Sequence, residues 1–215
     1  MSGNADRGLA AYLDEVAAGM PAPGGGSVTA VVGALAAALG EMVANLTLGR
    51  EKYADAEVSL RPARDRLTTL RSSLLDAAGA DEAAYQSYRD AASLPRTSDG
   101  EKTARTDAMQ WALIAATDVP LAAARAAYEV AEILQSVARD GNPHVRSDAA
   151  LGALLAEAAL RGALLNVRGN AAMLGDRELA MTYLTEADFL EKAGREAAQR
   201  AYRTAMGEAE EGRFR

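Results

Sequence analysis

Seven residues near the start of the chain, Pro21-Ala22-Pro23-Gly24-Gly25-Gly26-Ser27, stand directly before a long apolar helical pattern. The prolines exclude a helix in front of that pattern, and three successive glycines leave the backbone without side chains. Ser27 is a residue type favoured at helix N-caps, and the free N–H groups of a helix start attract anions or oxyanions. Three glycines, where one would serve a cap, favour close approach by a ligand or another backbone. We expect a helix from Ser27, preceded by a binding loop. We call Gly24, Gly25, Gly26 and Ser27 the glycine loop.

Neither of the two common phosphate-binding glycine motifs fits the glycine loop. A P-loop requires Gly-Lys-Ser/Thr, and no lysine follows these glycines. A dinucleotide fingerprint would need a glycine where the chain has Thr29, and a strand where it has Met20-Pro21. The loop therefore predicts a ligand site of another kind.

The apolar pattern at 27–48 is hydrophobic on nearly all sides, so we expect other helices to surround it as the central element of the fold. It is long enough to span a bilayer, but it is rich in Ala and Gly and carries Glu41 and Asn45. We interpret it as a buried core helix.

Helical periodicity covers most of the remaining chain, and the aromatic residues that favour strands are few, with 2 Phe and 1 Trp. The sequence therefore predicts one all-α domain, a bundle of about six helices over residues 1–215 with frayed ends at about 1–6 and 209–215. The predicted helices cover about 7–19, 27–48, 54–93, 99–138, 147–170 and 176–208.

Several residues set the expected helix ends. Pro62 is expected to kink its helix or to mark its first turn, and Pro120 to kink the next one. Ser98 or Asp99 is expected to cap the helix that contains Pro120. Ser147 is expected to cap the helix after the turn formed by residues 140–143.

The charge and the composition of the chain argue against several classes of partner and cofactor. A net charge of −7 argues against a nucleic-acid surface. The absence of Cys excludes disulfides and thiolate chemistry, and the presence of a single histidine, His144, argues against a His-rich metal site. Acidic residues interrupt any apolar run at the N-terminus. We expect a soluble, cytoplasmic protein without a metal and without a membrane or nucleic-acid partner.

Polar residues lie at matching intervals on two of the predicted helices. Ser27 and Asn45 are eighteen positions apart, as are Asp148 and Asn166, with Asn170 one turn further. Eighteen residues are five helical turns, so each pair shares a helix face but is separated by about 27 Å. Neither pair can converge on one atom within its own helix.

The packing direction of these two helices decides which polar groups meet. If they run antiparallel, the glycine loop meets Asn166 and Asn170, and Asp148 meets Asn45. If they run parallel, the glycine loop meets Asn142 and Asp148. Either arrangement gathers polar groups at two ends, which implies a long ligand or a site shared between subunits.

Three further sets of residues are candidates for binding or catalysis. Asp81 and Tyr85 share a helix face at i, i+4 spacing. Lys102 and Arg105 form one cationic pair, and a second, Arg50 and Lys52, follows the apolar helix. Charged sets of this kind are most often solvated surface.

Taken together, several motifs in this order resemble the cyclodeaminase/cyclohydrolase family, which comprises the C-terminal domain of formiminotransferase-cyclodeaminase and stand-alone methenyltetrahydrofolate cyclohydrolases. The resemblance covers about residues 8–185. It rests on Pro21–Ser27, Met42–Thr47, Asp81, Asn142 with Ser147-Asp148, Leu165–Val167 and Asn170, and also on Leu94-Pro95, Lys102, Arg105 and Val119-Pro120.

This resemblance implies an all-helical homodimer that binds a tetrahydrofolate derivative as substrate and needs no prosthetic group. The expected activity is hydrolysis of 5,10-methenyltetrahydrofolate to 10-formyltetrahydrofolate. One alternative is a formiminotetrahydrofolate cyclodeaminase that releases ammonia. Another is a non-catalytic helical dimer that binds folate or serves as a scaffold.

The resemblance also implies roles for the candidate residues. Asp81 or Asp148 is expected to move a proton, or to grip the amino edge of the pterin ring. The amides of Gly24, Gly25, Gly26 and Ser27 are expected to position an oxygen or the one-carbon bridge. The pterin or the water is expected to be oriented by Asn45, Asn142, Asn166 and Asn170. The glutamate carboxylates of folate are expected to meet Lys102 and Arg105, or Arg50 and Lys52.

Overall fold

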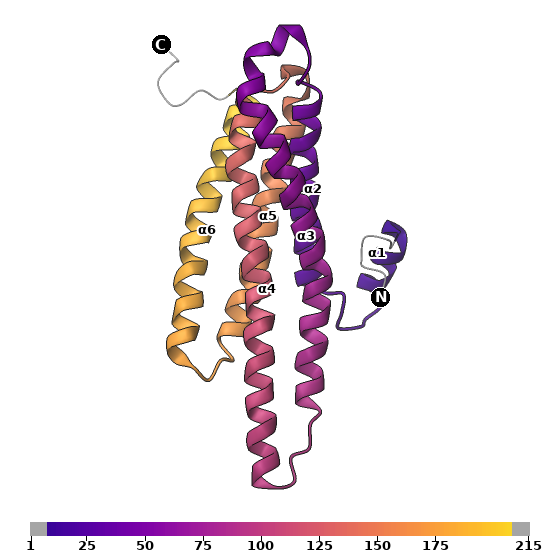
Figure 1. Ribbon diagram of the computed structural model, residues 1–215, viewed down its shortest axis with the longest axis vertical. Coiled ribbons are helices and arrows are strands. Elements are labelled where there is room, and N and C mark those ends of the chain that lie inside the picture. Colours follow the sequence, from indigo (N-terminus) through magenta and orange to yellow (C-terminus); the bar gives the residue numbers. More distant parts are fainter. Residues whose placement is uncertain (1–7, 208–215) are drawn as a thin grey trace.

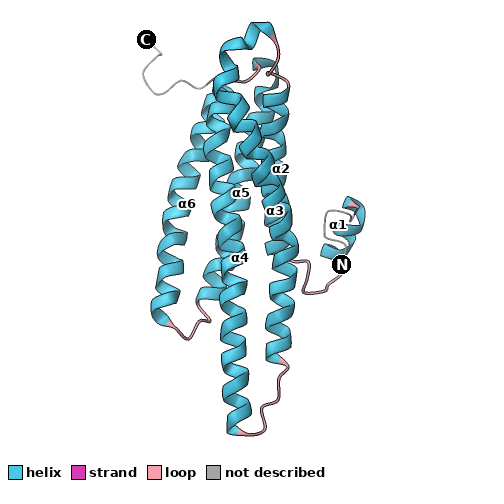
Figure 2. Cartoon of the chain, viewed as in Figure 1, coloured by secondary structure: helices cyan, strands magenta, loops and turns pink. Residues whose placement is uncertain are grey.

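The computed structural model describes residues 8–207, and in that range the secondary structure is helical with no strand (Figure 1, Figure 2). The predicted frayed ends lie outside the described residues. The helices are α1 (Leu9–Ala17), α2 (Gly25–Asn45), α3 (Glu57–Ala92), α4 (Asp99–Asp140), α5 (Arg146–Ala171) and α6 (Arg177–Met206), with short 3₁₀ helices at Glu51–Ala56 and Pro143–Val145. The prediction of a single all-α domain is confirmed.

Local sequence signals explain several helix ends. Ser98 begins α4 with a capping box, in which its side chain accepts from the Glu101 N–H and the Glu101 side chain returns to the Ser98 N–H. Asp176 caps α6, and Gly207 ends it with a left-handed φ of 71°. Pro62 and Pro120 both lie inside continuous helices.

Two of the predicted N-caps are wrong. Gly24, in extended conformation, is the N-cap of α2, and its carbonyl accepts from the Val28 N–H, so the helix begins two residues before Ser27. The N-cap of α5 is Val145, without a side-chain hydrogen bond, so Ser147 lies within the first turn. At α2, glycine supplies the entry geometry and the serine side chain is directed elsewhere.

Small residues set the packing of α2 against α5. A Cβ on Gly33 would lie 3.4 Å from the Ala159 Cβ, and one on Gly152 would lie 3.4 Å from the Ala36 carbonyl oxygen. The numbers rise along α2 as they fall along α5, so the two helices run antiparallel. The core that they share with α3, α4 and α6 is made of Ala, Leu and Val side chains, together with Tyr183.

Burial of α2 on all sides is not confirmed within one chain. Leu35 is 53% exposed and Met42 37%, although Ala36 and Ala37 on the opposite side are fully buried. By length and composition alone, α2 and the segment Pro143–Ala171 could each cross a membrane, but half of each apolar window is buried in the protein. A core helix of a soluble protein passes the same test.

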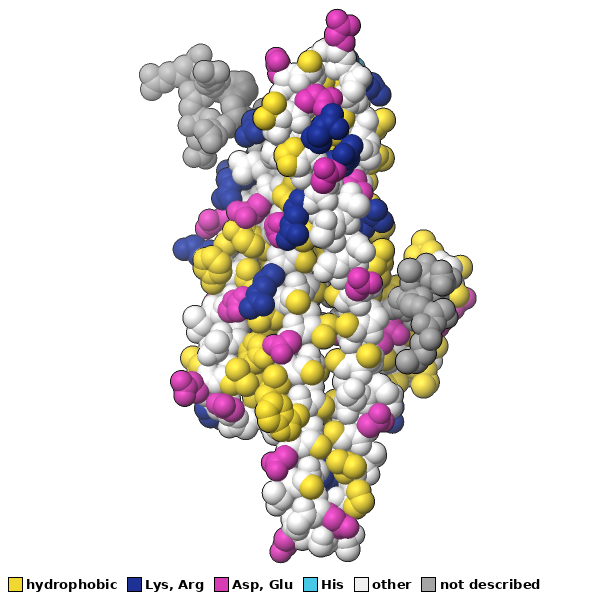
Figure 3. Space-filling view, in the orientation of Figure 1, with side chains coloured by type: hydrophobic (Ala, Val, Ile, Leu, Met, Phe, Trp, Pro, Cys, Tyr) yellow, Lys and Arg dark blue, Asp and Glu magenta, His cyan; other side chains and the backbone are white. Residues whose placement is uncertain are grey.

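The helices do not all reach the same level. The hairpin of α3 and α4 extends well beyond the start of α2, and α1 stands beside the bundle rather than within it (Figure 1). On the visible surface, hydrophobic side chains gather over α4 and α6 (Figure 3). The large exposed apolar residues of α4 and α6 include Trp111, Met181 and Phe189.

Candidate functional site

A cavity of about 220 Å³ lies where α2 begins, and we call it the glycine-loop cavity. Three of its sides come from α3, α4 and the end of α5, and the glycine loop closes the fourth. Its lining consists of Pro21, Ala22, Gly24, Gly25, Gly26, Asp81, Ala84, Tyr85, Tyr88, Leu113, Ala116, Asn166, Asn170 and Met173. The structure thus brings together six of the predicted site residues: Gly24, Gly25, Gly26, Asp81, Asn166 and Asn170.

Asp81 is seated against the start of α2. Its carboxylate accepts a hydrogen bond from the Ser27 N–H, and a Cβ built on Gly26 would lie only 2.1 Å from Asp81 Oδ1. Gly26 is therefore needed because the carboxylate occupies the space of a side chain. The helix start predicted to attract an anion receives a carboxylate of the same chain.

Burial raises the pKa of Asp81 above its ordinary value, and the Ser27 N–H partly opposes that shift. The charge of the neighbouring Glu82 raises the pKa further. A carboxyl group in a cavity whose pKa moves towards neutrality has the properties of a general acid or base.

The Ser27 hydroxyl faces away from the cavity and is fully buried. It donates to Glu82 Oε1 at 3.2 Å and lies 3.1 Å from the Tyr12 hydroxyl. Ser27 therefore contributes its backbone, and not its side chain, to the group around Asp81.

The two asparagines on α5 are oriented by main-chain carbonyls. Asn170 Nδ2 donates to the Ala116 carbonyl at 2.7 Å, and Asn166 Nδ2 donates to the Gly162 carbonyl at 3.4 Å. A carbonyl oxygen only accepts, so each amide must turn its NH₂ to it. The two Oδ1 atoms are left as acceptors for donors of a ligand.

The antiparallel packing of α2 and α5 places the remaining polar residues at the opposite end of the bundle. There Asn142 Oδ1 accepts from the Tyr53 hydroxyl at 2.8 Å, and its N–H donates to Thr47 Oγ1. Asn45 is exposed and Asp148 is half-buried. None of Asn45, Asn142 and Asp148 lines the glycine-loop cavity, and their predicted role stays a prediction.

The cationic pairs also lie outside the cavity. Lys102 pairs with Asp99 at 2.8 Å, and Arg105 Nε donates to the Ala92 carbonyl at 2.9 Å, both towards the tip of the α3–α4 hairpin. From Leu113, Arg105 is about 12 Å and Lys102 about 16 Å along α4. Lys52 lies over the Tyr53 ring, so the second pair belongs to the opposite end.

Sequence reasoning missed some of the lining. Tyr88 shares a face of α3 with Asp81, Ala84 and Tyr85 at i, i+3, i+4 and i+7 spacing, a signal that the sequence contains. Leu113, Ala116 and Met173 offered no such signal, because apolar residues on a helix usually belong to the core.

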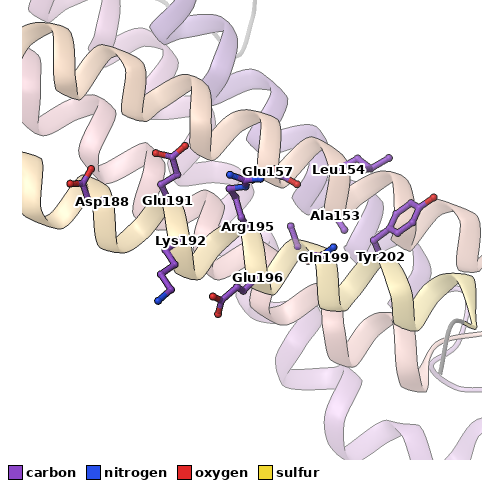
Figure 4. Close-up of a pocket in the computed structure, with 11 residues that line it drawn as sticks. Ala153, Leu154, Glu157, Asp188, Glu191, Lys192, Arg195, Glu196, Gln199 and Tyr202 are labelled. Carbon is purple, nitrogen blue, oxygen red and sulfur yellow. Dashed lines mark ion pairs between the residues drawn. The ribbon is translucent and has the colours of Figure 1, made fainter. Parts of the chain in front are cut away.

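A larger groove of about 640 Å³ lies on the surface between α5 and α6 (Figure 4). Two of its charged side chains, Arg195 and Glu157, form an ion pair at 3.7 Å, and Asp188 and Glu191 pair with Arg168, which does not line the groove. None of the predicted site residues lines it. Within residues 8–207, no group of three or more His, Asp or Glu side chains is arranged to hold a metal.

The fold and the cavity define a class: an all-helical protein whose small polar cavity combines a glycine-rich helix start, a buried carboxyl group and two oriented carboxamides. The sequence pattern of the formiminotransferase-cyclodeaminase family matches residues 8–189. The chain belongs to this family.

Named relatives agree with the family match. A methenyltetrahydrofolate cyclohydrolase from Methylorubrum extorquens is 40% identical over 95% of this chain and 97% of its own. A formimidoyltransferase-cyclodeaminase from Gallus gallus is 34% identical over 79% of this chain, which matches only 32% of that longer protein. The crystal structure of a formiminotetrahydrofolate cyclodeaminase from Thermotoga maritima superimposes with a TM-score of 0.85 at 31% identity, covering 94% of this chain and 98% of the other.

Proposed function

We propose that this protein hydrolyses 5,10-methenyltetrahydrofolate to 10-formyltetrahydrofolate. The observation that carries the proposal is Asp81, a carboxyl group of raised pKa held by the Ser27 N–H inside the glycine-loop cavity. The 40% identity to a cyclohydrolase over nearly the full length of both chains supports this activity over the alternatives.

The chemistry requires one proton carrier and stabilisation of a cation. Water adds to the amidinium carbon of the one-carbon bridge, and Asp81 takes a proton from that water. The bond from the bridge carbon to one nitrogen then breaks, Asp81 returns the proton to the departing nitrogen, and the hydroxyl proton is lost to solvent as the formyl C=O forms. The Asp81 carboxyl group lines the cavity and so lies near a substrate that carries positive charge. Proton transfer by a positioned group contributes about 10²–10⁴-fold.

The cavity accommodates one end of the substrate. About 220 Å³ suits a bicyclic head group rather than a whole folate. The Oδ1 atoms of Asn166 and Asn170 suit the N–H donors of a pterin, and Tyr85 and Tyr88 supply aromatic surface. The tail then leaves along the α3–α4 hairpin, where Arg105 and Lys102 are positioned to meet its carboxylates.

Cyclodeamination of formiminotetrahydrofolate is the second candidate. It is favoured by the Thermotoga maritima structure, which covers nearly the whole chain. The same cavity serves both reactions, because each passes through an adduct at the bridge carbon and needs one proton carrier. The leaving group is ammonia in the cyclodeaminase reaction and one of the two bridged folate nitrogens in the cyclohydrolase reaction.

We also propose that the protein is a cytoplasmic homodimer without a prosthetic group. The outward faces of α2 and α5 carry Leu35, Met42, Leu151, Leu154 and Leu165, each at least 37% exposed. A second copy packed antiparallel on this face would bring the Asn45 end of one chain towards the glycine loop of the other. That arrangement gives Asn142 and Asp148 a place in a site shared between subunits. The net charge of −7 supports the absence of a nucleic-acid partner.

The decisive experiment follows the absorbance of methenyltetrahydrofolate with purified protein against the spontaneous rate in the same buffer. Acceleration that is lost in Asp81→Asn supports the cyclohydrolase. Release of ammonia from formiminotetrahydrofolate, without such acceleration, supports the cyclodeaminase. Folate binding with neither activity would overturn both and leave a binding protein or scaffold.

A further inference from the structure

The shortest α-helix of the described residues, α1, contacts the start of α2 through the side chain of Tyr12. Tyr12 is the buried residue of α1, while Leu9 and Leu13 are 69% and 56% exposed. The Tyr12 hydroxyl reaches Ser27 Oγ at 3.1 Å. Because the segment after α1 contributes Pro21 and Ala22 to the glycine-loop cavity, this contact also restrains one wall of the cavity.

The direction of the hydrogen bonds follows from the number of protons. A serine hydroxyl carries one hydrogen, and Ser27 donates it to Glu82 Oε1 at 3.2 Å. Ser27 Oγ therefore accepts from Tyr12, so the bonds run from Tyr12 to Ser27 to Glu82. Ser27 is fully buried, which shields both bonds from competition with water.

The same serine holds the other carboxylate with its backbone. The Ser27 N–H donates to Asp81 while its hydroxyl donates to Glu82, the next residue of α3. Two adjacent carboxylates are thus bound to opposite sides of one residue in the first turn of α2. A change at Glu82 is expected to move Ser27, and with it the partner of Asp81.

We propose that Glu82 is a positioning residue, which through Ser27 fixes the carboxylate of Asp81 and ties α1 to the wall of the cavity. This inference rests on the proposed function, because it assigns Glu82 a role in the reaction of that site. Glu82 itself does not line the cavity, so it acts through Ser27 rather than on the substrate.

The charge of Glu82 gives the role a signature. Glu82 raises the pKa of Asp81, so neutralising it lowers that pKa. The other titratable groups around Asp81 are Tyr85 and Tyr88 on the same helix, and Tyr12 across Ser27; the remaining lining from α2, α4 and α5 is not titratable. The limb of the pH–rate profile that reports Asp81 then moves to lower pH.

The test compares Glu82→Gln, Ser27→Ala and Tyr12→Phe with a control, Asp76→Asn, an exposed carboxylate six residues earlier on α3. We expect Glu82→Gln to lower kcat about tenfold, the effect of one hydrogen bond to a charged group, and to move that limb to lower pH. We expect Tyr12→Phe to raise KM without moving the limb, and to have no further effect in the Ser27→Ala background. The unchanged helical circular dichroism of each variant shows that it is folded.

Two outcomes would overturn the inference while leaving the proposed function intact. One is a Glu82→Gln enzyme with the kcat, KM and pH profile of the Asp76→Asn control. The other is a Tyr12→Phe substitution that has the same effect in the wild-type background and in the Ser27→Ala background. Absence of turnover in the wild-type protein would instead overturn the proposed function, and this inference with it.

Discussion

The two ends of the bundle use the same residue types in opposite ways. At the end opposite the glycine loop, Asn142 engages its partners within the chain: Oδ1 accepts from Tyr53 and His144, its N–H donates to Thr47, and Nδ2 contacts the Leu46 carbonyl at 3.5 Å. At the glycine-loop end, Asn166 and Asn170 use only their NH₂ groups in this way. The hydrogen bonds of Asn142 hold together the segments that connect the helices. Asn166 and Asn170 instead leave their Oδ1 atoms as acceptors for a ligand.

The carboxylates differ in the same sense. Hydrogen bonds from Arg139 lower the pKa of Asp140 at the far end, whereas burial raises that of Asp81 in the cavity. The charge of Asp140 is thus stabilised by the fold, and that of Asp81 is disfavoured by it. A group whose charge is disfavoured without a ligand is better suited to moving protons.

The comparison is tested most strongly by removing the charge of Asp81. We expect Asp81→Asn to lower turnover about 10²–10⁴-fold, because the amide cannot carry the proton. Asp148→Asn is the matched substitution at the other end, and we expect it to change turnover far less. Steady-state rates of both variants with methenyltetrahydrofolate decide, and an equal loss in both would mean that Asp148 also takes part in the proton transfer, from the second subunit.

The position of the Asp81 carboxylate is tested next, by substituting two neighbouring glycines. A Cβ on Gly26 meets Asp81 Oδ1 at 2.1 Å, while one on Gly25 meets nothing within 4 Å. The carboxylate can rotate away more easily than the backbone can move, so we expect Gly26→Ala to fold but to lose at least about tenfold in turnover. Gly25→Ala, whose Cβ does not meet Asp81, should lose less turnover than Gly26→Ala. A Gly26→Ala enzyme as active as Gly25→Ala would show that Asp81 works in another position.

At the opposite end the expected loss is of stability. Asn142→Ala removes the acceptor of Tyr53 and of the His144 N–H, so we expect the free energy of unfolding to fall by about 1–3 kcal/mol. Urea unfolding measures this change. Asn166→Ala, which breaks one long hydrogen bond of 3.4 Å, should cost less stability and weaken folate binding instead. The reverse pattern would remove the distinction between the two ends.

The smallest expected effects concern pH and stability. Because the pKa of Asp140 is lower in the folded state than its ordinary value of 3.8, the charged carboxylate stabilises the fold above pH 3.8. This contribution is lost as pH falls through the folded-state pKa. The raised pKa of Asp81 acts in the opposite direction, since stability falls as pH rises from 3.8 through the folded-state pKa. At pH 7, Asp140→Asn should therefore lower the melting temperature, and Asp81→Asn should raise it or leave it unchanged. Each substitution should change the free energy of unfolding by less than about 1 kcal/mol. Melting curves at pH 7 and below pH 4 would contradict this if both variants shifted in the same direction.

Much of the fold was predictable from short-range patterns. Six helices, the breaks between them and the Ser98 cap follow from periodicity, proline and capping chemistry, which act over a few residues. The start of α2 did not follow, because serine and glycine are both acceptable N-caps. Which residue becomes the N-cap depends on Glu82 and Tyr12, because both are distant in sequence and form hydrogen bonds with the Ser27 hydroxyl.

The candidate site was predictable in its parts. Gly26, Asp81, Asn166 and Asn170 stood out because polar groups and bare backbone are unusual beside apolar helices. Their assembly could not be read from the sequence, which left parallel and antiparallel packing of two helices equally open.

The sequence by itself determined the helical class, the glycine loop and the set of polar residues, because these depend on local conformational preference and on the spacing of residues along a helix. Only the tertiary structure decided that Asp81 sits on Gly26, that Asn166 and Asn170 join it and that Asn142 does not. Those choices depend on side-chain volumes fitting between helices, as at Gly33 and Gly152, and such contacts join residues more than a hundred positions apart.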